Sequence, residues 1–174
     1  MENFYYLCNP SVKEAGRPEN IDKKMVSFIG TYSAKVDDKG RVVFPSPLKS
    51  LMPEGGDMRF VLHKDIHARC LEMYTFEQWQ SQSEGIKSKL NSLNPRHAAF
   101  WRGYMQNRAL VEPDGKLGRI SIPRDLQTLI GIDKEVVFVG NDYKIEIWAR
   151  DEYEKSIISQ EDFTALATEL SQQL

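Results

Sequence analysis

Two glycine–arginine pairs are the residues of this 174-residue chain whose type and spacing best suit binding chemistry. One pair lies in the stretch Lys39–Pro45 (KGRVVFP) and the other in Leu117–Pro123 (LGRISIP), so that Arg41 and Arg119 are 78 positions apart. An arginine presents a planar fork of donors that matches phosphate and the major-groove edge of guanine. The glycine before it permits the positive φ of a tight turn into a strand. We therefore predict two arginines, each presented by a turn to a polyanion.

Lysines accompany both arginines and suit contacts with phosphate. A second interpretation is local, because Arg41 can pair with Asp37 or Asp38 and hold its turn. Both roles are compatible, since an acid can orient an arginine that also reaches DNA. The predicted DNA-binding residues are Lys35, Lys39, Arg41, Lys116 and Arg119, with Gly40 and Gly118 forming the turns.

A second group, His63-x3-His67-x2-Cys70, has the residue types of a metal site. Zinc needs a fourth ligand in a fixed geometry, and we favour a surface hairpin here. The sequence shows no Ser-His-Asp arrangement, nucleophilic cysteine or glycine-rich phosphate loop. We therefore expect no metal, no cofactor, no small-molecule substrate and no enzymatic activity.

The elements that position the arginines also occur twice. Each arginine opens a β-branched or aromatic run that ends at a proline, Pro45 or Pro123, which indicates a short strand. Leucines follow each proline after three and six residues, and Phe60–Leu62 lies as far past Arg41 as 138–140 lies past Arg119. Such an internal repeat predicts two copies of one plan, namely strand, Gly-Arg turn, strand, short helix, strand pair and longer helix.

Helices are predicted between the copies and after them. Thr75 with Gln78 matches a capping box for a helix running toward Leu90. Asn94 and Pro95 open a second helix that is apolar around much of its girth and so needs partners on more than one side. Ser159 with Asp162 opens a C-terminal helix whose apolar stripe must dock on something.

Charge is segregated along the chain, although the net charge is only −2. Residues 35–49 carry four basic and two acidic side chains, and residues 82–124 carry eight and three. Residues 125–174 carry four basic and eleven acidic side chains. Both Gly-Arg pairs thus lie in basic segments, as a footprint for phosphate would. The alternative is that these charges are solvated faces of helices.

Composition favours a soluble globular protein, with 41% hydrophobic and 28% charged residues. No apolar run is long enough to span a bilayer, and no secretory signal is visible at the start. Two cysteines, Cys8 and Cys70, do not make a disulfide framework and favour a reducing cytoplasm.

The doubled phrase resembles the MraZ family. It runs Asp37-x-Lys39-Gly40-Arg41-x3-Pro45 and returns as Gly118-Arg119-x3-Pro123, and the stretch Tyr143–Trp148 is similar to that family's second-half hairpin. The resemblance covers residues 25 to about 158. The second copy has one residue more between Asp114 and its Gly-Arg pair, which leaves open whether Arg119 is presented as Arg41 is.

The resemblance implies an α+β fold of two tandem SpoVT-AbrB-type modules that form a pseudo-two-fold swapped-hairpin β-barrel. It implies a transcriptional regulator of the bacterial division and cell-wall gene cluster, cytoplasmic and associated with the nucleoid. Its partners would be double-stranded DNA with repeated promoter sites and further copies of itself in a ring-shaped homo-oligomer. The alternative is a structural or protein-interaction module without DNA binding.

The expected organisation has five parts. They are an N-terminal extension (1–24), a first module (25–80), a helical connector (81–109), a second module (110–158) and a C-terminal helix (159–174).

Overall fold

The computed structural model of the chain describes residues 26–172. The predicted extension, including Cys8, lies outside this range. The strands are β1 (Phe28–Lys35), β2 (Arg41–Val43), β3 (Phe60–Lys64), β4 (Cys70–Thr75), β5 (Arg108–Val111), β6 (Arg119–Ser121), β7 (Glu135–Asp142) and β8 (Lys144–Ala149). The helices are α1 (Ser46–Lys49), α2 (Phe76–Lys87), α3 (Pro95–Met105), α4 (Arg124–Ile130), α5 (Arg150–Ser156) and α6 (Gln160–Gln172). Within this range no helix combines the length and apolar content that crossing a bilayer requires.

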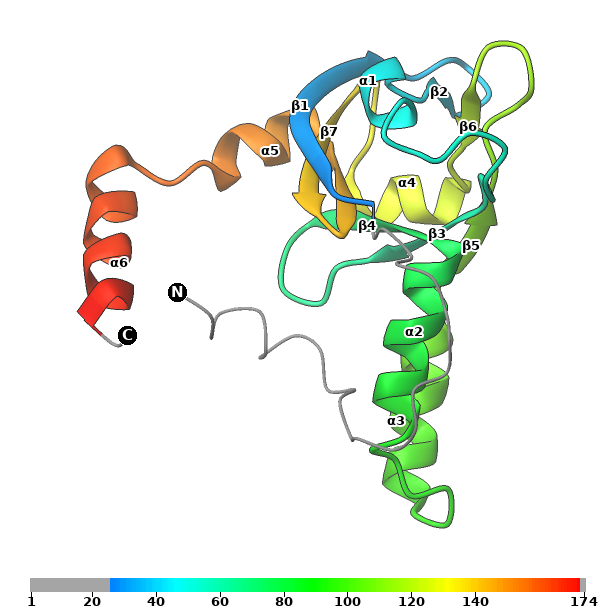
Figure 1. The fold of residues 1–174 in the computed structure, drawn as a ribbon, viewed down its shortest axis with the longest axis vertical. Coiled ribbons are helices and arrows are strands. Elements are labelled where there is room, and N and C mark those ends of the chain that lie inside the picture. Colours follow the sequence, from blue (N-terminus) through cyan, green and yellow to red (C-terminus); the bar gives the residue numbers. More distant parts are fainter. Residues whose placement is uncertain (1–25, 173–174) are drawn as a thin grey trace.

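The order of elements confirms the predicted repeat (Figure 1). The series β1, β2, α1, β3, β4 and α2 returns as β5, β6, α4, β7, β8 and α5. α5 holds the place in the second copy that α2 holds in the first, in agreement with the longer helix predicted for each copy. Among the helices and strands of residues 26–172, only α3 and α6 stand outside the repeat.

The strands pair between the copies as well as within them. Six strands form an antiparallel sheet in the order β1-β7-β8-β4-β3-β5. The first strand of each copy therefore pairs with the other copy, β1 with β7 and β5 with β3. The two shortest strands, β2 and β6, form a separate antiparallel pair, which we call the β2–β6 ribbon. The fold is thus mixed α+β, as predicted, and neither copy completes its sheet alone.

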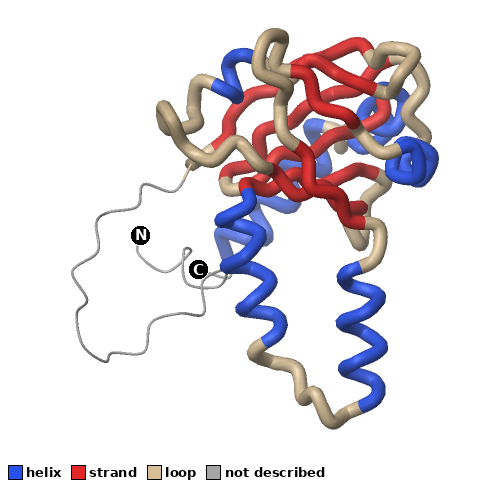
Figure 2. Tube along the Cα trace, turned by 90° about the vertical axis from the view of Figure 1, so that its right-hand side faces the viewer, coloured by secondary structure: helices blue, strands red, loops and turns tan. Residues whose placement is uncertain are grey.

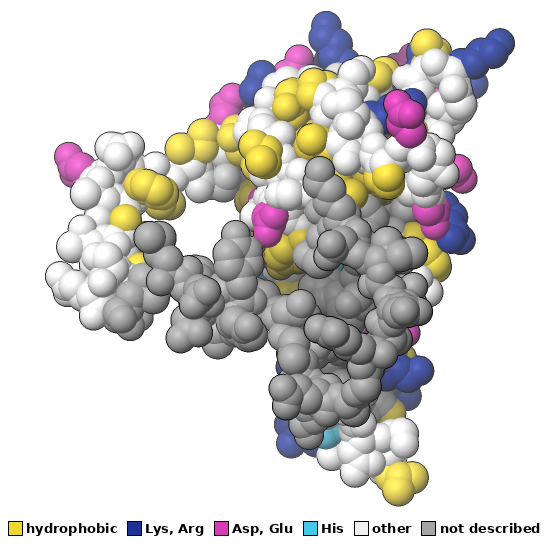
Figure 3. Space-filling view, in the orientation of Figure 1, with side chains coloured by type: hydrophobic (Ala, Val, Ile, Leu, Met, Phe, Trp, Pro, Cys, Tyr) yellow, Lys and Arg dark blue, Asp and Glu magenta, His cyan; other side chains and the backbone are white. Residues whose placement is uncertain are grey.

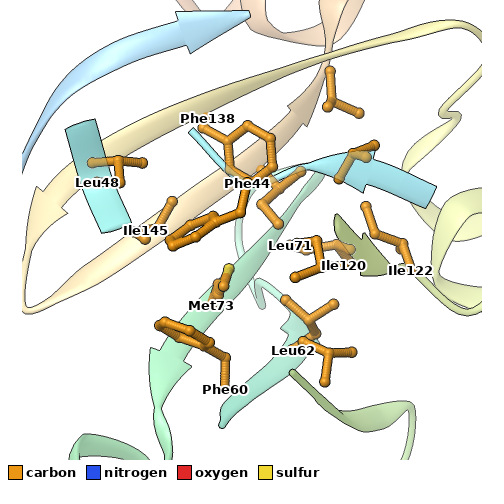
Figure 4. Packing of buried hydrophobic residues seen from close by; sticks show 14 of the residues in the cluster. Phe44, Leu48, Phe60, Leu62, Leu71, Met73, Ile120, Ile122, Phe138 and Ile145 are labelled. Carbon is orange, nitrogen blue, oxygen red and sulfur yellow. The ribbon is translucent and has the colours of Figure 1, made fainter. Parts of the chain in front are cut away.

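One hydrophobic core joins the two copies (Figure 4). Phe44 follows β2 and lies between Phe60 and Phe138, with ring centroids 5.4 and 6.1 Å away. Phe60 and Phe138 occupy equivalent positions of the two copies. Val42 and Ile120 anchor the ribbon to this core, because both are buried while their neighbours along each strand face outward.

Two helical parts project from the sheet. The α2–α3 hairpin extends as two separate legs (Figure 2), and α6 lies apart from the sheet on the far side of α5 (Figure 1). The predicted starts are confirmed, since Thr75 and Gln78 form the capping box of α2 and Asn94 Oδ1 accepts from Arg96 N at 2.9 Å. The Ser159 hydroxyl likewise accepts from Asp162 N at 3.0 Å before α6. α2 ends at Lys87, one turn short of the predicted Leu90.

Candidate nucleic-acid interface

The first Gly-Arg turn is built around one carboxylate. Asp37 Oδ1 accepts from the backbone N–H groups of Lys39 and Arg41, each at 2.9 Å. Gly40 has φ +74° and its N–H donates to Asp37 O at 2.8 Å. Only a glycine adopts this left-handed conformation without strain. The turn is therefore held by backbone hydrogen bonds to Asp37 and by the positive φ of Gly40, and the sequence predicts such a glycine turn.

The first turn holds Arg41 through part of its guanidinium group and leaves other donors of that group unbonded within the described part of the chain. Its Nε and Nη2 contact Asp37 Oδ2 at 2.9 and 2.8 Å, which confirms the predicted local pairing. These hydrogen bonds hold the pKa of Asp37 at about 2, below its usual value. Among residues 26–172 the Nη1 group has no hydrogen-bond partner, and the side chain is 35% exposed. The pair therefore orients a guanidinium that keeps donors for a ligand.

The second turn reproduces the backbone of the first despite its extra residue. Gly118 has φ +61°, and its N–H donates to Asp114 O at 3.0 Å. Asp114 Oδ1 accepts from Leu117 N at 3.3 Å and from Arg119 N at 3.1 Å, as Asp37 does for its own turn. These backbone bonds lower the pKa of Asp114. No ion pair joins Arg119 to a carboxylate within the described residues, so this arginine is less restrained than Arg41.

The β2–β6 ribbon brings the two arginines onto one face. Arg41 lies opposite Ser121, and Val43 lies opposite Arg119, so the arginines are diagonal neighbours. Such neighbours on one face of an antiparallel pair have Cα atoms about 7–8 Å apart. The buried Val42 and Ile120 point the other way, and these four residues face outward. The sequence predicts both turns, but their common face comes from the pairing of the two copies.

The ends of the ribbon are tied across the copies. Phe44 N donates to Gly118 O at 2.8 Å, and Ile122 N donates to Gly40 O at 3.1 Å. Gln127 of α4 also binds the first turn, because its Nε2 donates to Ile122 O at 2.6 Å and to Gly40 O at 3.4 Å. Each turn is thus fixed by residues of the other copy.

A sixth basic residue, which the sequence analysis missed, lies at the second turn. Lys49 occupies the position in the first copy that Gln127 occupies in the second. Its Nζ is 3.8 Å from where a Cβ at Gly118 would stand, and its side chain is exposed. The repeat could have shown this from the sequence, since Lys49 and Gln127 each directly follow the first leucine after the proline of their copy. Lys49 adds a cation beside Arg119.

The predicted lysines are all exposed but do not all lie equally near the arginines. Lys39 and Lys116 lie within the two turns, whereas Lys35 ends β1 opposite Glu135. Arg124 is exposed at the start of α4 and lines a groove with the first turn. Basic side chains project from the end of the molecule that carries the ribbon (Figure 3).

The surface-hairpin interpretation of the His63 group is wrong for two of its three residues. His63 in β3 and Cys70 in β4 are buried, because they lie within the six-stranded sheet, and only His67 is exposed in the connecting loop. Burial raises the pKa of the Cys70 thiol to about 12, so it is a core residue rather than a nucleophile. No three histidine, cysteine or acidic side chains between residues 26 and 172 are grouped to hold a metal ion.

A buried polar group surrounds His63 on the same sheet. Its Nε2 lies 3.2 Å from Glu72 Oε2, and the other oxygen of Glu72 accepts from Lys144 Nζ. The His63 ring stacks on Tyr74 with centroids 5.4 Å apart. Burial lowers the pKa of His63 to about 4, and its Nδ1 lies 3.1 Å from Lys64 O. This group is structural, since it lies in the sheet and away from the ribbon.

The fold and the ribbon define a class of protein, one in which two copies of a β module interlock and present paired basic turns on one face. Comparisons with known proteins give the family. A family model described as "MraZ protein, putative antitoxin-like" matches residues 105–174.

Relatives named "Transcriptional regulator MraZ" match most of the chain. One from Bacteroides fragilis is 33% identical over 146 residues, covering 84% of this chain and 92% of the relative. One from Flavobacterium psychrophilum is 36% identical over 147 residues, with 84% and 92% covered. One from Clostridium tetani is 32% identical over 145 residues, with 83% and 97% covered.

The chain belongs to the MraZ family, which confirms the resemblance stated from the doubled phrase. This is a family of transcriptional regulators and not of enzymes, in agreement with the expectation that the chain has no enzymatic activity.

Proposed function

We propose that this protein is a sequence-specific DNA-binding transcriptional regulator that uses the outward face of the β2–β6 ribbon. One observation carries the proposal: two arginines from separate copies share a rigid exposed face, with Lys39, Lys116 and Lys49 beside them. The names of its relatives support the same role. Arginines provide bidentate contacts to guanine or phosphate, and the lysines provide phosphate contacts.

The finer parts of the proposal follow from membership of the family. We propose that the protein acts on repeated promoter sites of the bacterial division and cell-wall gene cluster as a ring-shaped homo-oligomer, in the cytoplasm at the nucleoid. The interlocked pairing of β1 with β7 and β5 with β3 supports a swapped-hairpin barrel of two modules, 25–80 and 110–158, joined through 81–109. A ring would array many ribbons along repeated sites, so that weak contacts add.

Replacing Arg41 by alanine tests the proposal. Binding of the full chain to DNA from its own upstream region should weaken by about 5- to 150-fold, because one bidentate contact contributes about 1–3 kcal/mol. Binding should be measured by fluorescence anisotropy over a salt series. If Arg41 contacts phosphate, its loss lowers the magnitude of the log–log salt slope by about 1 and weakens binding to all sequences alike. If Arg41 contacts a base, its loss lowers the ratio of specific to non-specific binding.

Arg59→Ala is the matched control. Arg59 forms a similar aspartate pair, with Nη2 2.6 Å from Asp57 Oδ2 and a side chain 45% exposed, but it directly precedes β3 and lies outside the ribbon. This variant should bind DNA as the wild type does. Unchanged binding by Arg41→Ala, or an equal loss of binding in Arg41→Ala and Arg59→Ala, would remove the ribbon from the DNA interface.

The second candidate function is a protein-interaction module. It is favoured by the acidic last third of the chain and by α6, which the described part of the molecule leaves exposed. A complete absence of binding to the upstream DNA at low salt would favour it over the regulator.

A further inference from the structure

Helix α6 carries an apolar stripe that the described part of the chain does not cover. Phe163, Leu166 and Leu170 follow the three- and four-residue spacing of one helix face and are 58, 51 and 53% exposed. The helix has no buried residue and makes no extended contact with any other described element. Burying side chains of this kind is favourable, because it removes apolar area from water. The stripe is therefore expected to be covered in the assembled protein.

The α2–α3 hairpin leaves a second apolar surface open. Its two helices make no extended contact with each other, and they stand apart as separate legs (Figure 2). α3 has no buried residue, and Phe100 and Met105 are 50 and 38% exposed. Leu93, in the loop that joins the helices, is 90% exposed. Apolar side chains are visible over α6 and at the end of the hairpin (Figure 3).

The charges of these two surfaces are complementary. The hairpin, residues 76–105, carries four basic and two acidic side chains. Its part 85–105, which includes all of α3, holds all four basic side chains and no acidic one. Residues 156–172, which include all of α6, carry three acidic side chains and no basic one. Opposite charge around two apolar surfaces steers their encounter and fixes their register.

We propose that α6 of one copy docks on the α2–α3 hairpin of a second copy. The apolar stripe of α6 contacts Phe100, Met105 and the inner side of the hairpin, while Asp162 and Glu169, at the edges of the stripe, face its basic residues. The contact is head to tail, because each copy offers two different surfaces. A contact of this type closes into a ring when the rotation between copies allows it. The inference rests on the homo-oligomer of the proposed function and names the surfaces that build it.

DNA fits the hairpin less well than a second copy does. The hairpin points away from the end of the molecule that carries the ribbon (Figure 1). A duplex would neutralise the basic residues but would leave Leu93, Phe100 and Met105 without apolar partners. A helix that brings both acids and an apolar stripe satisfies both properties.

Two variants of the full chain test the docking. The stripe variant is Leu166→Ser with Leu170→Ser, and the hairpin variant is Phe100→Ser with Met105→Ser. Because these side chains are exposed, the substitutions remove little from the core of a single copy. Circular dichroism and thermal unfolding should therefore show an unchanged fold. Ile66→Ser, at a loop position 75% exposed, is the control. Light scattering without DNA should give a closed oligomer for the wild type and the control, and a monomer for each variant.

Mixing the two variants gives the sharper result. The stripe variant keeps an intact hairpin, and the hairpin variant keeps an intact α6, so an equimolar mixture can form one interface and no more. The expected mass is that of a 1:1 dimer, which labelling one variant identifies.

Several results would overturn the inference. A hairpin variant that keeps the wild-type mass would exclude the hairpin and indicate α6 self-association or docking of residues 1–25. If that variant also loses DNA binding, the hairpin is assigned to DNA. A stripe variant that keeps the wild-type mass would exclude α6, and a mixture that stays monomeric would exclude the pairing of these two surfaces. A monomeric wild type would remove the docking and the ring, whereas DNA binding through Arg41 is measured separately.

Discussion

At the residue scale, Arg41 and Arg119 show that a shared backbone does not imply a shared environment. Asp37 and Asp114 cap the two turns through the same backbone donors, but only Asp37 also holds its arginine. Arg41 is thus pre-organised, and Arg119 must lose more conformational freedom when it binds. We expect Arg41 to set specificity more strongly than Arg119.

His63 gives a pH prediction at this scale. Burial lowers its pKa from 6.5 to about 4, so the unfolded chain binds a proton here more readily than the folded chain. The stabilisation is therefore complete above pH 6.5 and is lost as the pH falls toward 4, by up to about 3 kcal/mol at 1.36 kcal/mol per pH unit. Denaturant unfolding between pH 7 and 4 measures the loss.

Two variants assign this loss. His63→Gln should flatten the dependence, whereas the exposed His67→Gln should leave it unchanged. A dependence that survives in His63→Gln would show that another group is responsible.

At the scale of elements, the two turns differ in how tightly the other copy packs on them. A Cβ at position 40 would overlap Gln127 Nε2, whereas a Cβ at position 118 would meet only Lys49 Nζ at 3.8 Å. Gln127 bridges two carbonyls, so its displacement disrupts the tie between α4 and the first turn.

Alanine substitution should therefore cost more at the first turn. The positive φ costs about 1–2 kcal/mol at either site. Gly40→Ala should lose about 1 kcal/mol more, because the hydrogen bonds of Gln127 are displaced. Free energies of unfolding from urea titration compare the two, with Gly115→Ala as a control at a site with open space. Equal losses at positions 40 and 118 would contradict the role assigned to Gln127.

At the scale of the whole molecule, the two copies form one unit. Strands exchange partners between the copies, and the core includes residues from both. Phe44 lies between the equivalent Phe60 and Phe138, so it joins the cores of the two copies. The chain should accordingly unfold as one cooperative unit, although its sequence divides into two modules.

Phe44→Ala tests this cooperativity. The truncation should cost about 3–5 kcal/mol and keep a single transition with an unchanged m-value, at a fixed protein concentration. The milder Phe44→Leu should cost less than half as much. Two separate transitions in either variant, seen by fluorescence and circular dichroism, would show that the modules unfold independently.

The sequence by itself determined the doubled plan, the two glycine turns, the helix caps at Thr75, Asn94 and Ser159, and the family. These features are readable because φ preferences, capping bonds and the period of apolar residues act between near neighbours. Only the tertiary structure decided that β1 and β5 exchange between the copies, that both arginines face one way, that Lys49 joins them, and that His63 and Cys70 are buried. Each of these depends on contacts between residues far apart in the chain, which local preferences do not specify.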